Sequence, residues 1–372
     1  MNSRERVAAT VRLRQPDRVP LDYWATPEVD ERLMAEFDLP DLAALRRFLK
    51  VDMVHVPVPL KEGARKYLSD GDFIDEWGCR QTWQKHPSGG GYRERITAPL
   101  ADIDSIEGLS KFEFPRLDVY DWEQFSRDLD TYDGFSIYGG FHIIFARHWF
   151  LRGMEGCMLD LGLRPDFTRA LAERCADWEC EFLSKTIEVG AGRIHYLPTY
   201  DDWGMQSGLM LSLQSFRDCY KEPIRRTFEL ARSLGVGIFC HTDGSLVEIL
   251  DDLMELGVAI LNPVQTTCDG MDPEMLKRDY GDRVCFHGAI DTQYVLPYGT
   301  PEDVRRETLS RIAQFGEGGG YVACSCHNLQ PDVPTENIMA MYETVWQFGD
   351  YPLDVRSELD RLGPPPEHWD SR

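Results

Sequence analysis

The chain has 372 residues, of which 42% are hydrophobic and 28% are charged, and its formal net charge is −23. This length allows one large barrel or two smaller domains, and the acidic balance argues against nucleic acid and anionic membranes as partners. No stretch is long and apolar enough to span a bilayer, and the N-terminus lacks the apolar region of a secretory signal. We therefore expect a cytoplasmic protein in which the ten cysteines form no disulfide framework.

The first third of the chain mixes helices and strands with one segment of different composition. The pattern predicts helices at 3–14, 27–37 and 41–49 and strands at 18–24 and 52–58. Residues from about 73 to 98 are rich in aromatic side chains and are divided by a Pro-Ser-Gly-Gly-Gly segment at 87–91. This composition indicates a β-hairpin insertion with a loop between its strands. Acidic helical segments follow, up to about residue 131.

Strands and helices then alternate regularly. The apolar runs predict strands at 135–141, 193–199, 236–240, 258–264, 283–289 and 321–325, each followed by helical material. With the two earlier strands this gives eight units, and their apolar, β-branched composition implies a parallel sheet. We expect an α/β fold: a single (β/α)₈ TIM barrel over residues 1–372, with an N-terminal helical extension and the hairpin insertion. No G-x-G-x-x-G follows any strand, so the dinucleotide fingerprint is absent.

The segment 237–244, GIFCHTDG, combines a short buried strand with a cluster of potential ligands. Alternate residues of an extended segment share a face, so His241 and Asp243 point together. Gly244 is expected to turn the backbone, and Ser245 to begin a helix that ends near residue 256. The alternative interpretation is a core histidine and an aspartate that caps this helix.

Other predicted strands also end in polar groups, and in a barrel these ends converge on one rim. The strand ends supply Asp22, Tyr23, His55, Phe141, His142, Tyr200, Asp201, Asp202, Trp203, His241, Asp243, Asn262, Gln265, His287, Asp291, Cys324, Cys326, His327 and Asn328. So many titratable groups in one place indicate an enzyme. We expect catalytic roles for Asp201, Asp202, His241 and His327. We expect substrate contacts from Tyr23, Trp24, His55, Phe141, His142, Trp203, Gln265 and His287.

A metal site is a further expectation at this rim. Histidine with thiolate or carboxylate ligands suits Zn²⁺, and the candidates are His241, Asp243, Cys326 and His327. The alternative is that Cys324 and Cys326 pack in the core and His327 hydrogen-bonds a neighbouring loop. No two of these ligands have a diagnostic local spacing, unlike a paired C-x-x-C.

Several long stretches of the chain resemble the uroporphyrinogen decarboxylase superfamily. They are DDWGMQSGLMLSLQSFRDCYKEPI (201–224), FCHTDG (239–244), LNPVQTTCDGMDPEMLKRDYGDR (261–283), HGAIDTQYVLPYGTPEDV (287–304) and GGGYVACSCHNLQPDVPTENIMAMYE (318–343). The resemblance implies a (β/α)₈ barrel that is often a homodimer. It also implies one of two chemistries: cofactor-free decarboxylation of a porphyrinogen, or methyl transfer between corrinoid proteins and thiols or folates.

The decarboxylase motifs are replaced in this chain. Tyr23-Trp24-Ala25-Thr26-Pro27 stands where those enzymes carry Arg-Gln-Ala-Gly-Arg, and residues 56–60 lack their pyrrole-binding aspartate. In the methyltransferase branch, zinc is bound by a His-x-Cys pair and a later cysteine. His241 matches that histidine, Asp243 stands in place of the paired cysteine, and the later cysteine falls nearest His327, beside Cys326.

We therefore expect a methyltransferase of this superfamily, acting on a small-molecule substrate with possible Zn²⁺ activation. Any cobalamin would be carried by a separate corrinoid protein, because the chain has no corrinoid-binding Asp-x-His-x-x-Gly stretch. One alternative is a cofactor-free decarboxylase that acts on a carboxylate substrate. The other is a non-catalytic barrel that binds a small ligand.

Overall fold

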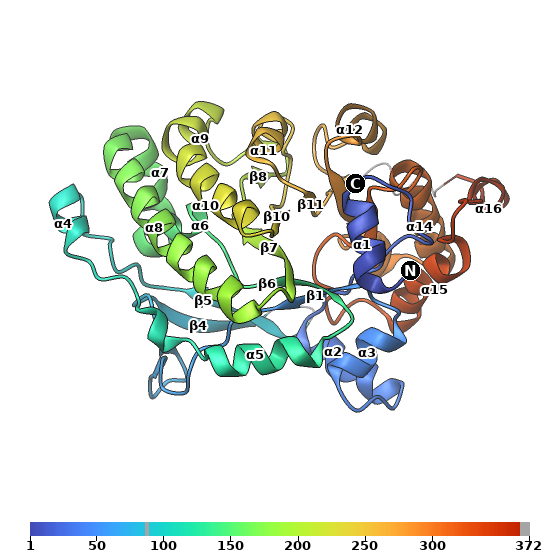
Figure 1. The fold of residues 1–372 in the computed structure, drawn as a ribbon, viewed down its shortest axis with the longest axis horizontal. Coiled ribbons are helices and arrows are strands. Elements are labelled where there is room, and N and C mark those ends of the chain that lie inside the picture. The colour runs from blue at the N-terminus through green and yellow to red at the C-terminus, as the bar shows by residue number, and fades with distance from the viewer. Residues whose placement is uncertain (86–88, 365–372) are drawn as a thin grey trace.

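The computed structural model describes residues 1–85 and 89–364. At its centre is a parallel sheet of seven strands, in the order β1-β6-β7-β10-β11-β12-β13, with helices around it (Figure 1). The strands are β1 (Met53–Val56), β6 (Ser136–Gly139), β7 (Ile194–Tyr200), β10 (Gly237–His241), β11 (Ile260–Asn262), β12 (Cys285–Ile290) and β13 (Tyr321–Ser325). All seven lie within or next to segments that the apolar runs predict, which confirms the parallel α/β architecture.

The first predicted strand, 18–24, forms only isolated bridges, yet it occupies the eighth position of the barrel. Leu21 makes a parallel bridge with Ala323 of β13. On its other side, the Leu21 carbonyl accepts a hydrogen bond of 2.7 Å from the N–H of Asp52, directly before β1. The Asp52 carboxylate in turn accepts from the Leu21 N–H at 3.0 Å. This segment therefore joins the first and last strands of the sheet and closes it in the manner of a TIM barrel.

Apolar side chains fill the half of the barrel at the amino-terminal ends of its strands. Seven strands each contribute one residue to this layer: Met53, Tyr138, Tyr196, Phe239, Ile260, Cys285 and Val322. Val7 of α1 (Ser3–Val11) packs against the layer, so α1 covers the amino-terminal end of the barrel. Because strand residues two apart share a face, the next inward-pointing residue of each strand lies toward the carboxyl-terminal rim.

The helices outside the sheet start and stop largely where the sequence signals predict. They are α2 (Pro27–Glu36), α3 (Leu42–Phe48), α6 (Phe145–Arg152), α7 (Met154–Leu163), α8 (Pro165–Gly190), α9 (Leu213–Cys219), α10 (Lys221–Ser233), α11 (Leu250–Leu256), α12 (Pro273–Tyr280), α13 (Val295–Tyr298), α14 (Pro301–Phe315), α15 (Thr335–Phe348) and α16 (Arg356–Leu362). At α14 the start is fixed by a capping box between Thr300 and Asp303, with proline at the first helical position.

The predicted helix from Ser245 is wrong at its start, because α11 begins only at Leu250. Gly244 does turn the backbone, with φ of +92°, and a Cβ there would lie 2.4 Å from the carbonyl carbon of Gly204. The loop that follows is held by other segments: the N–H of Ser245 donates to the Met205 carbonyl at 2.8 Å. These long-range contacts override the local helical pattern.

Residues before β6 form a separate antiparallel sheet of four strands, in the order β2-β3-β4-β5. The strands are β2 (Lys66–Tyr67), β3 (Phe73–Ile74), β4 (Arg80–Lys85) and β5 (Gly91–Arg95), and α4 (Ile106–Ser110), a 3₁₀ turn (Leu117–Val119) and α5 (Trp122–Thr131) follow. The β4–β5 pair confirms the predicted hairpin, although the first part of its predicted loop (87–91) lies outside the described residues. A small two-stranded sheet, β8 (Gly204–Met205) and β9 (Gly208–Leu209), lies directly after β7.

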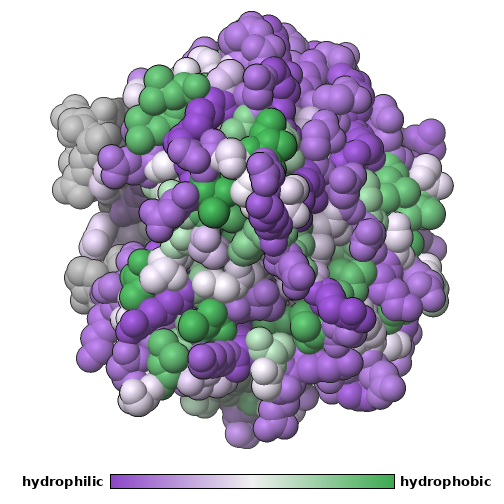
Figure 2. Space-filling view, turned by 90° about the vertical axis from the view of Figure 1, so that its left-hand side faces the viewer, coloured by the Kyte–Doolittle hydropathy of each residue, from purple (hydrophilic) through white to green (hydrophobic). Residues whose placement is uncertain are grey.

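The surface on the side of the molecule shown in Figure 2 is mostly hydrophilic, with hydrophobic patches separated by polar side chains. Within the described ranges, no helix combines the length and the apolar composition that crossing a membrane requires.

Candidate active site

A polar layer lies directly above the apolar layer of the barrel. It contains His55, His241, Asn262 and His287, each two positions further along its strand, and Tyr200, four positions after Tyr196. Imidazole, amide and phenol groups thus replace the aliphatic and aromatic side chains of the layer below. Because buried polar groups are costly without partners, their hydrogen bonds show how the layer is organised.

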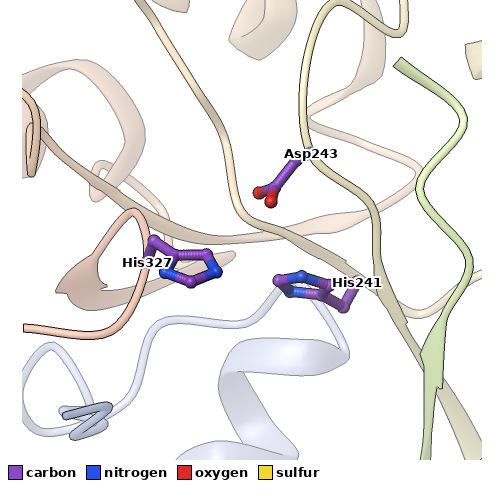
Figure 3. A group of neighbouring side chains, drawn as sticks. All are labelled: His241, Asp243 and His327. Carbon is purple, nitrogen blue, oxygen red and sulfur yellow. The ribbon is translucent and has the colours of Figure 1, made fainter. Parts of the chain in front are cut away.

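Three side chains converge at the carboxyl-terminal edge of this layer, His241 being one of its members. His241 at the end of β10, Asp243 just after it and His327 after β13 point toward one another (Figure 3). One potential ligand atom from each lies within 4.8 Å of the others. Two imidazoles and a carboxylate form a donor set typical of catalytic metal sites. The fold therefore brings three of the four predicted metal ligands together.

The His241 imidazole is held in one orientation by a chain of hydrogen bonds across the barrel. Its Nδ1–H donates to the Asn262 side-chain carbonyl at 2.6 Å, and the Asn262 amide donates to Nδ1 of His287 at 2.7 Å. Nε2–H of His287 donates to the Asp22 carboxylate at 3.0 Å. This pattern assigns the protons, because a carboxylate only accepts and an amide nitrogen only donates. It leaves the lone pair on Nε2 of His241 directed toward Asp243 and His327.

The carboxylate of Asp243 carries a buried oxygen without a partner. Among the described residues, its Oδ1 has no hydrogen bond although it is inaccessible to solvent. The neighbouring carboxylate of Asp202 accepts from the Asp243 N–H at 3.2 Å and lies 3.9 Å from Nε2 of His241. An unsatisfied buried oxygen beside an imidazole lone pair is the arrangement that a bound cation would complete.

Cys326, the alternative fourth ligand, lies outside this cluster. Its buried thiol donates to the carbonyl of Val264 at 3.3 Å, and its N–H donates to the carbonyl of Ile290 at 2.8 Å. The chain turns after β13, so Cys326 packs between neighbouring strands while His327 turns toward His241. The structure therefore favours His/Asp/His over His/Asp/Cys.

An aromatic cavity of about 430 Å³ adjoins the cluster. Its lining residues are Tyr23, Trp24, Ala25, Asp30, Arg46, His55, Pro57, Tyr138, Phe141, Tyr200 and Asn328. The rings of Trp24 and Tyr200 lie 5.2 and 5.4 Å from the imidazole of His241, between centroids. The cavity is of the size that takes a small ligand, and four of the predicted substrate contacts, Tyr23, Trp24, His55 and Phe141, line it.

Other predicted site residues lie elsewhere. Both carboxylate oxygens of Asp201 accept backbone N–H bonds at the start of α6, from Ile144 at 2.9 Å and Ala146 at 2.8 Å. Nε2–H of His142 donates to the hydroxyl of Thr227 of α10 at 2.9 Å, since that hydroxyl donates its own proton to the Ile224 carbonyl, on the outer side of the sheet.

The indole of Trp203 is also outside the cavity, because it stacks on Phe145 of α6 with ring centroids 4.7 Å apart. Gln265 does not line the cavity either, since its side-chain carbonyl accepts from the N–H of Gly244 and so holds the loop next to Asp243. These residues pack against or hydrogen-bond the segments that carry the site, and they do not line the cavity. His287 is likewise buried and acts through Asn262.

Burial changes the titration of several of these groups. It raises the pKa of Asp201 to about 7 and lowers the pKa of His55 to about 4. It also raises the pKa of Asp202 above its usual range and lowers that of His327. His55 and His327 are therefore neutral at pH 7, and a neutral imidazole is the form that binds a metal ion or accepts a proton.

The sequence patterns do not indicate the residues that orient the ligands, or two of the residues that line the cavity. Asn262 and Asp22 stand at predicted strand ends, but no local pattern indicates that they share a hydrogen-bonded chain. Arg46 and Asp30 lie in predicted helices and carry no signal that they face the barrel mouth.

The chain is similar to known proteins of one family. The model of that family, described as "Uroporphyrinogen decarboxylase (URO-D)", matches residues 150–348, which include all three cluster residues. A uroporphyrinogen decarboxylase of Psychromonas ingrahamii is 27% identical over 197 residues, 50% of this chain and 49% of that protein. One of Alkalilimnicola ehrlichii is 27% identical over 217 residues, 55% of this chain and 54% of that protein. The chain thus spans about half the length of these curated relatives.

A solved structure has the same overall architecture. The "methyltransferase from Methanosarcina mazei" superposes with a TM-score of 0.68 at 18% sequence identity, over 94% of this chain and 99% of that one. At this identity the likeness concerns the fold alone, and it agrees with the barrel described above. Because the family model covers more than half of the chain and includes β7 to α15, the chain belongs to the uroporphyrinogen decarboxylase (URO-D) family.

Proposed function

We propose that the protein is a metal-dependent methyltransferase of this family. It moves a methyl group between a small organic substrate or a separate corrinoid protein and an acceptor. The observation that carries the proposal is the cluster of His241, Asp243 and His327, whose ligand atoms lie within 4.8 Å of one another next to the aromatic cavity. The methyltransferase with the same architecture supports it further.

The residues of the cluster fit a divalent ion such as Zn²⁺. His241 offers an oriented Nε2 lone pair and Asp243 a buried oxygen without a partner, and three protein ligands leave a position open, as in catalytic zinc sites. A bound divalent ion would supply Lewis acidity that lowers the pKa of an acceptor X–H group.

The chain's own side chains then have separate tasks. The aromatic walls orient the substrate, and Asp202, 3.9 Å from Nε2 of His241, accepts the proton of the X–H group. The lone pair of X forms the new bond to the methyl carbon. The bond between that carbon and the donor breaks, and its electron pair stays with the donor.

Metal binding by the 372-residue chain tests the first step. We expect chelator-treated protein to bind one equivalent of Zn²⁺, and His241→Ala and His327→Ala each to remove this binding because each loses a ligand. Cys326→Ser and Asp251→Asn serve as controls and should bind as the wild type does, since Cys326 lies outside the cluster and Asp251 is exposed on α11. Absence of stoichiometric binding in the wild type contradicts the metal site.

Methyl transfer requires a separate measurement. We expect the zinc-loaded protein to change the visible spectrum of methylcobalamin in the presence of a thiol, as the cobalt–carbon bond is lost and the thioether forms. The His241→Ala protein should leave the spectrum unchanged. An unchanged spectrum with the wild type and a range of thiol and folate acceptors counts against methyl transfer, even if Zn²⁺ binds.

A cofactor-free decarboxylase is the second candidate, favoured by the names of the curated relatives. In that case Asp202 would donate a proton to the carbanion left by carbon dioxide, which suits its raised pKa. Release of carbon dioxide from a carboxylate substrate by chelator-treated protein would favour this reaction over methyl transfer.

A further inference from the structure

The aromatic cavity contains a guanidinium group that the proposed metal chemistry does not use. Arg46 of α3 lines the cavity, and within the described parts of the chain no carboxylate lies within 4.0 Å of its nitrogens. Its ring contact is with Tyr132, 4.9 Å from the guanidinium carbon to the ring centroid. Arginine in a partly enclosed site normally pairs with an anion, because the fork of N–H donors matches a carboxylate.

The carboxyl group in the same cavity does not take this role. Asp30 of α2 accepts a hydrogen bond of 2.6 Å from the hydroxyl of Tyr23. Burial raises the pKa of Asp30, and Arg46 acts on it only from a distance. One oxygen of Asp30 is thus occupied, and the donors of Arg46 remain available to a ligand.

The other residues that line the cavity favour ligands of a particular shape. Five aromatic rings line the cavity, from Tyr23, Trp24, Tyr138, Phe141 and Tyr200. Rigid aromatic walls favour flat apolar ligands, which contact them at little cost in side-chain entropy. The volume of about 430 Å³ is enough for a substituted aromatic ring.

We propose that the cavity binds a planar aromatic monocarboxylate, with its carboxylate on Arg46. Trp24 and Tyr200 lie both in the cavity wall and against His241, so a ring held between these walls lies beside the metal ligands. This inference names the substrate class of the proposed function and rests on it for the identity of the transferred methyl group. Arg46 is then a specificity-determining residue.

Binding of benzoate to the chelator-treated 372-residue chain tests the proposal, with calorimetry as the readout. Chelation prevents the carboxylate from binding at the cluster, and turnover plays no part in the measurement. We expect benzoate to bind the wild type, benzamide to bind more weakly, and Arg46→Gln to weaken benzoate binding by about tenfold or more while leaving benzamide unchanged. Arg46→Lys should recover part of the affinity, because it keeps the charge but loses the fork.

The matched control is Arg47→Gln, which changes the next arginine of the same helix. Arg47 is exposed and donates to the Thr131 carbonyl at 3.3 Å, so its loss should leave benzoate binding as in the wild type. The proposal is overturned if benzoate does not bind, if Arg46→Gln and Arg47→Gln behave alike, or if trimethylglycine, a quaternary ammonium compound, binds better than benzoate. Failure of the proposed function would appear elsewhere, as missing Zn²⁺ binding or methyl transfer with benzoate binding intact.

Discussion

Asn262 shows how a single side chain can determine the chemistry of a neighbouring imidazole. Its carbonyl accepts from His241 and its amide donates to His287, so the two groups impose opposite tautomers on the two histidines. Ligand histidines in metal sites commonly depend on such a second contact for their orientation. Leucine has a similar size but could make neither hydrogen bond.

We expect Asn262→Leu to weaken Zn²⁺ binding by about ten- to a hundredfold. The variant leaves all three ligands in place but no longer holds the proton on Nδ1 of His241. Competition with a chromophoric chelator measures the affinity, and near-ultraviolet circular dichroism shows whether the barrel is intact. An intact variant with wild-type affinity would mean that the hydrogen-bonded chain has no part in orienting the imidazole.

The sequence predicts individual metal ligands, but it does not predict which residues hold them in place. The period of two along an extended segment predicts that His241 and Asp243 point together, and the cluster has this arrangement. The choice between Cys326 and His327 depends on how the chain turns after β13, which is a tertiary property. Arg46 could not be predicted, because nothing in a helical sequence tells which helix face meets the barrel mouth.

At the level of secondary structure, α8 carries an ionisable group into the core. Glu179 is 1% exposed, its Oε1 accepts from the N–H of Ile143 at 3.2 Å, and the nearest Arg147 nitrogen lies 3.9 Å away. Its other carboxylate oxygen has no partner among the described residues. Burial raises the pKa of Glu179 to about 8, so the group is largely protonated in the folded protein at pH 7.

This shift predicts a pH dependence of stability. Above its usual value of 4.5, the unfolded chain loses the proton that the folded chain keeps until about pH 8. The folded state therefore binds more protons in this window, and the free energy of unfolding falls as the pH rises from 4.5 to 8. We expect Glu179→Gln to reduce this fall, measured as the midpoint of thermal unfolding at several pH values.

Glu181→Gln, on the exposed side of the same helix, is the control and should unfold with the pH dependence of the wild type. A Glu179→Gln profile parallel to that of the wild type would show that Glu179 does not titrate in this range.

Secondary structure follows from local sequence wherever no other segment competes for the backbone. The helix α14 begins at its predicted proline because its capping box uses only local groups. The N–H groups of Gly244 and Ser245 donate instead to Gln265 and Met205, which lie far away in the sequence and which the local pattern does not indicate. The delayed start of α11 is the result.

In the whole molecule, the barrel is closed by a segment with few strand contacts of its own. Asp52 holds that segment and is fully buried. Its carboxylate accepts from Arg6 at 2.7 Å, from Arg18 at 2.8 Å and from the N–H of Leu21 at 3.0 Å. One carboxylate therefore ties α1, the closing segment and the start of β1 together.

We expect Asp52→Ala to lower the free energy of unfolding by roughly 3 to 5 kcal/mol, because the buried Arg6 guanidinium and the buried Leu21 N–H each lose a partner and Arg18 loses its ion pair. Urea denaturation gives this value from the transition midpoint. Asp130→Ala removes an exposed carboxylate that pairs with Arg193, and it should cost less than about 1 kcal/mol. Equal losses in the two variants would contradict the role of Asp52 in closing the barrel.

The chain of hydrogen bonds from His241 ends at Asp22, which belongs to the closing segment. A cation bound by His241, Asp243 and His327 would therefore also stabilise residues 18–24, which close the barrel, and would slow their local opening. Amide hydrogen exchange at Leu21 and Asp52, measured with and without Zn²⁺, tests this link. We expect both N–H groups to exchange more slowly when Zn²⁺ is bound at the cluster.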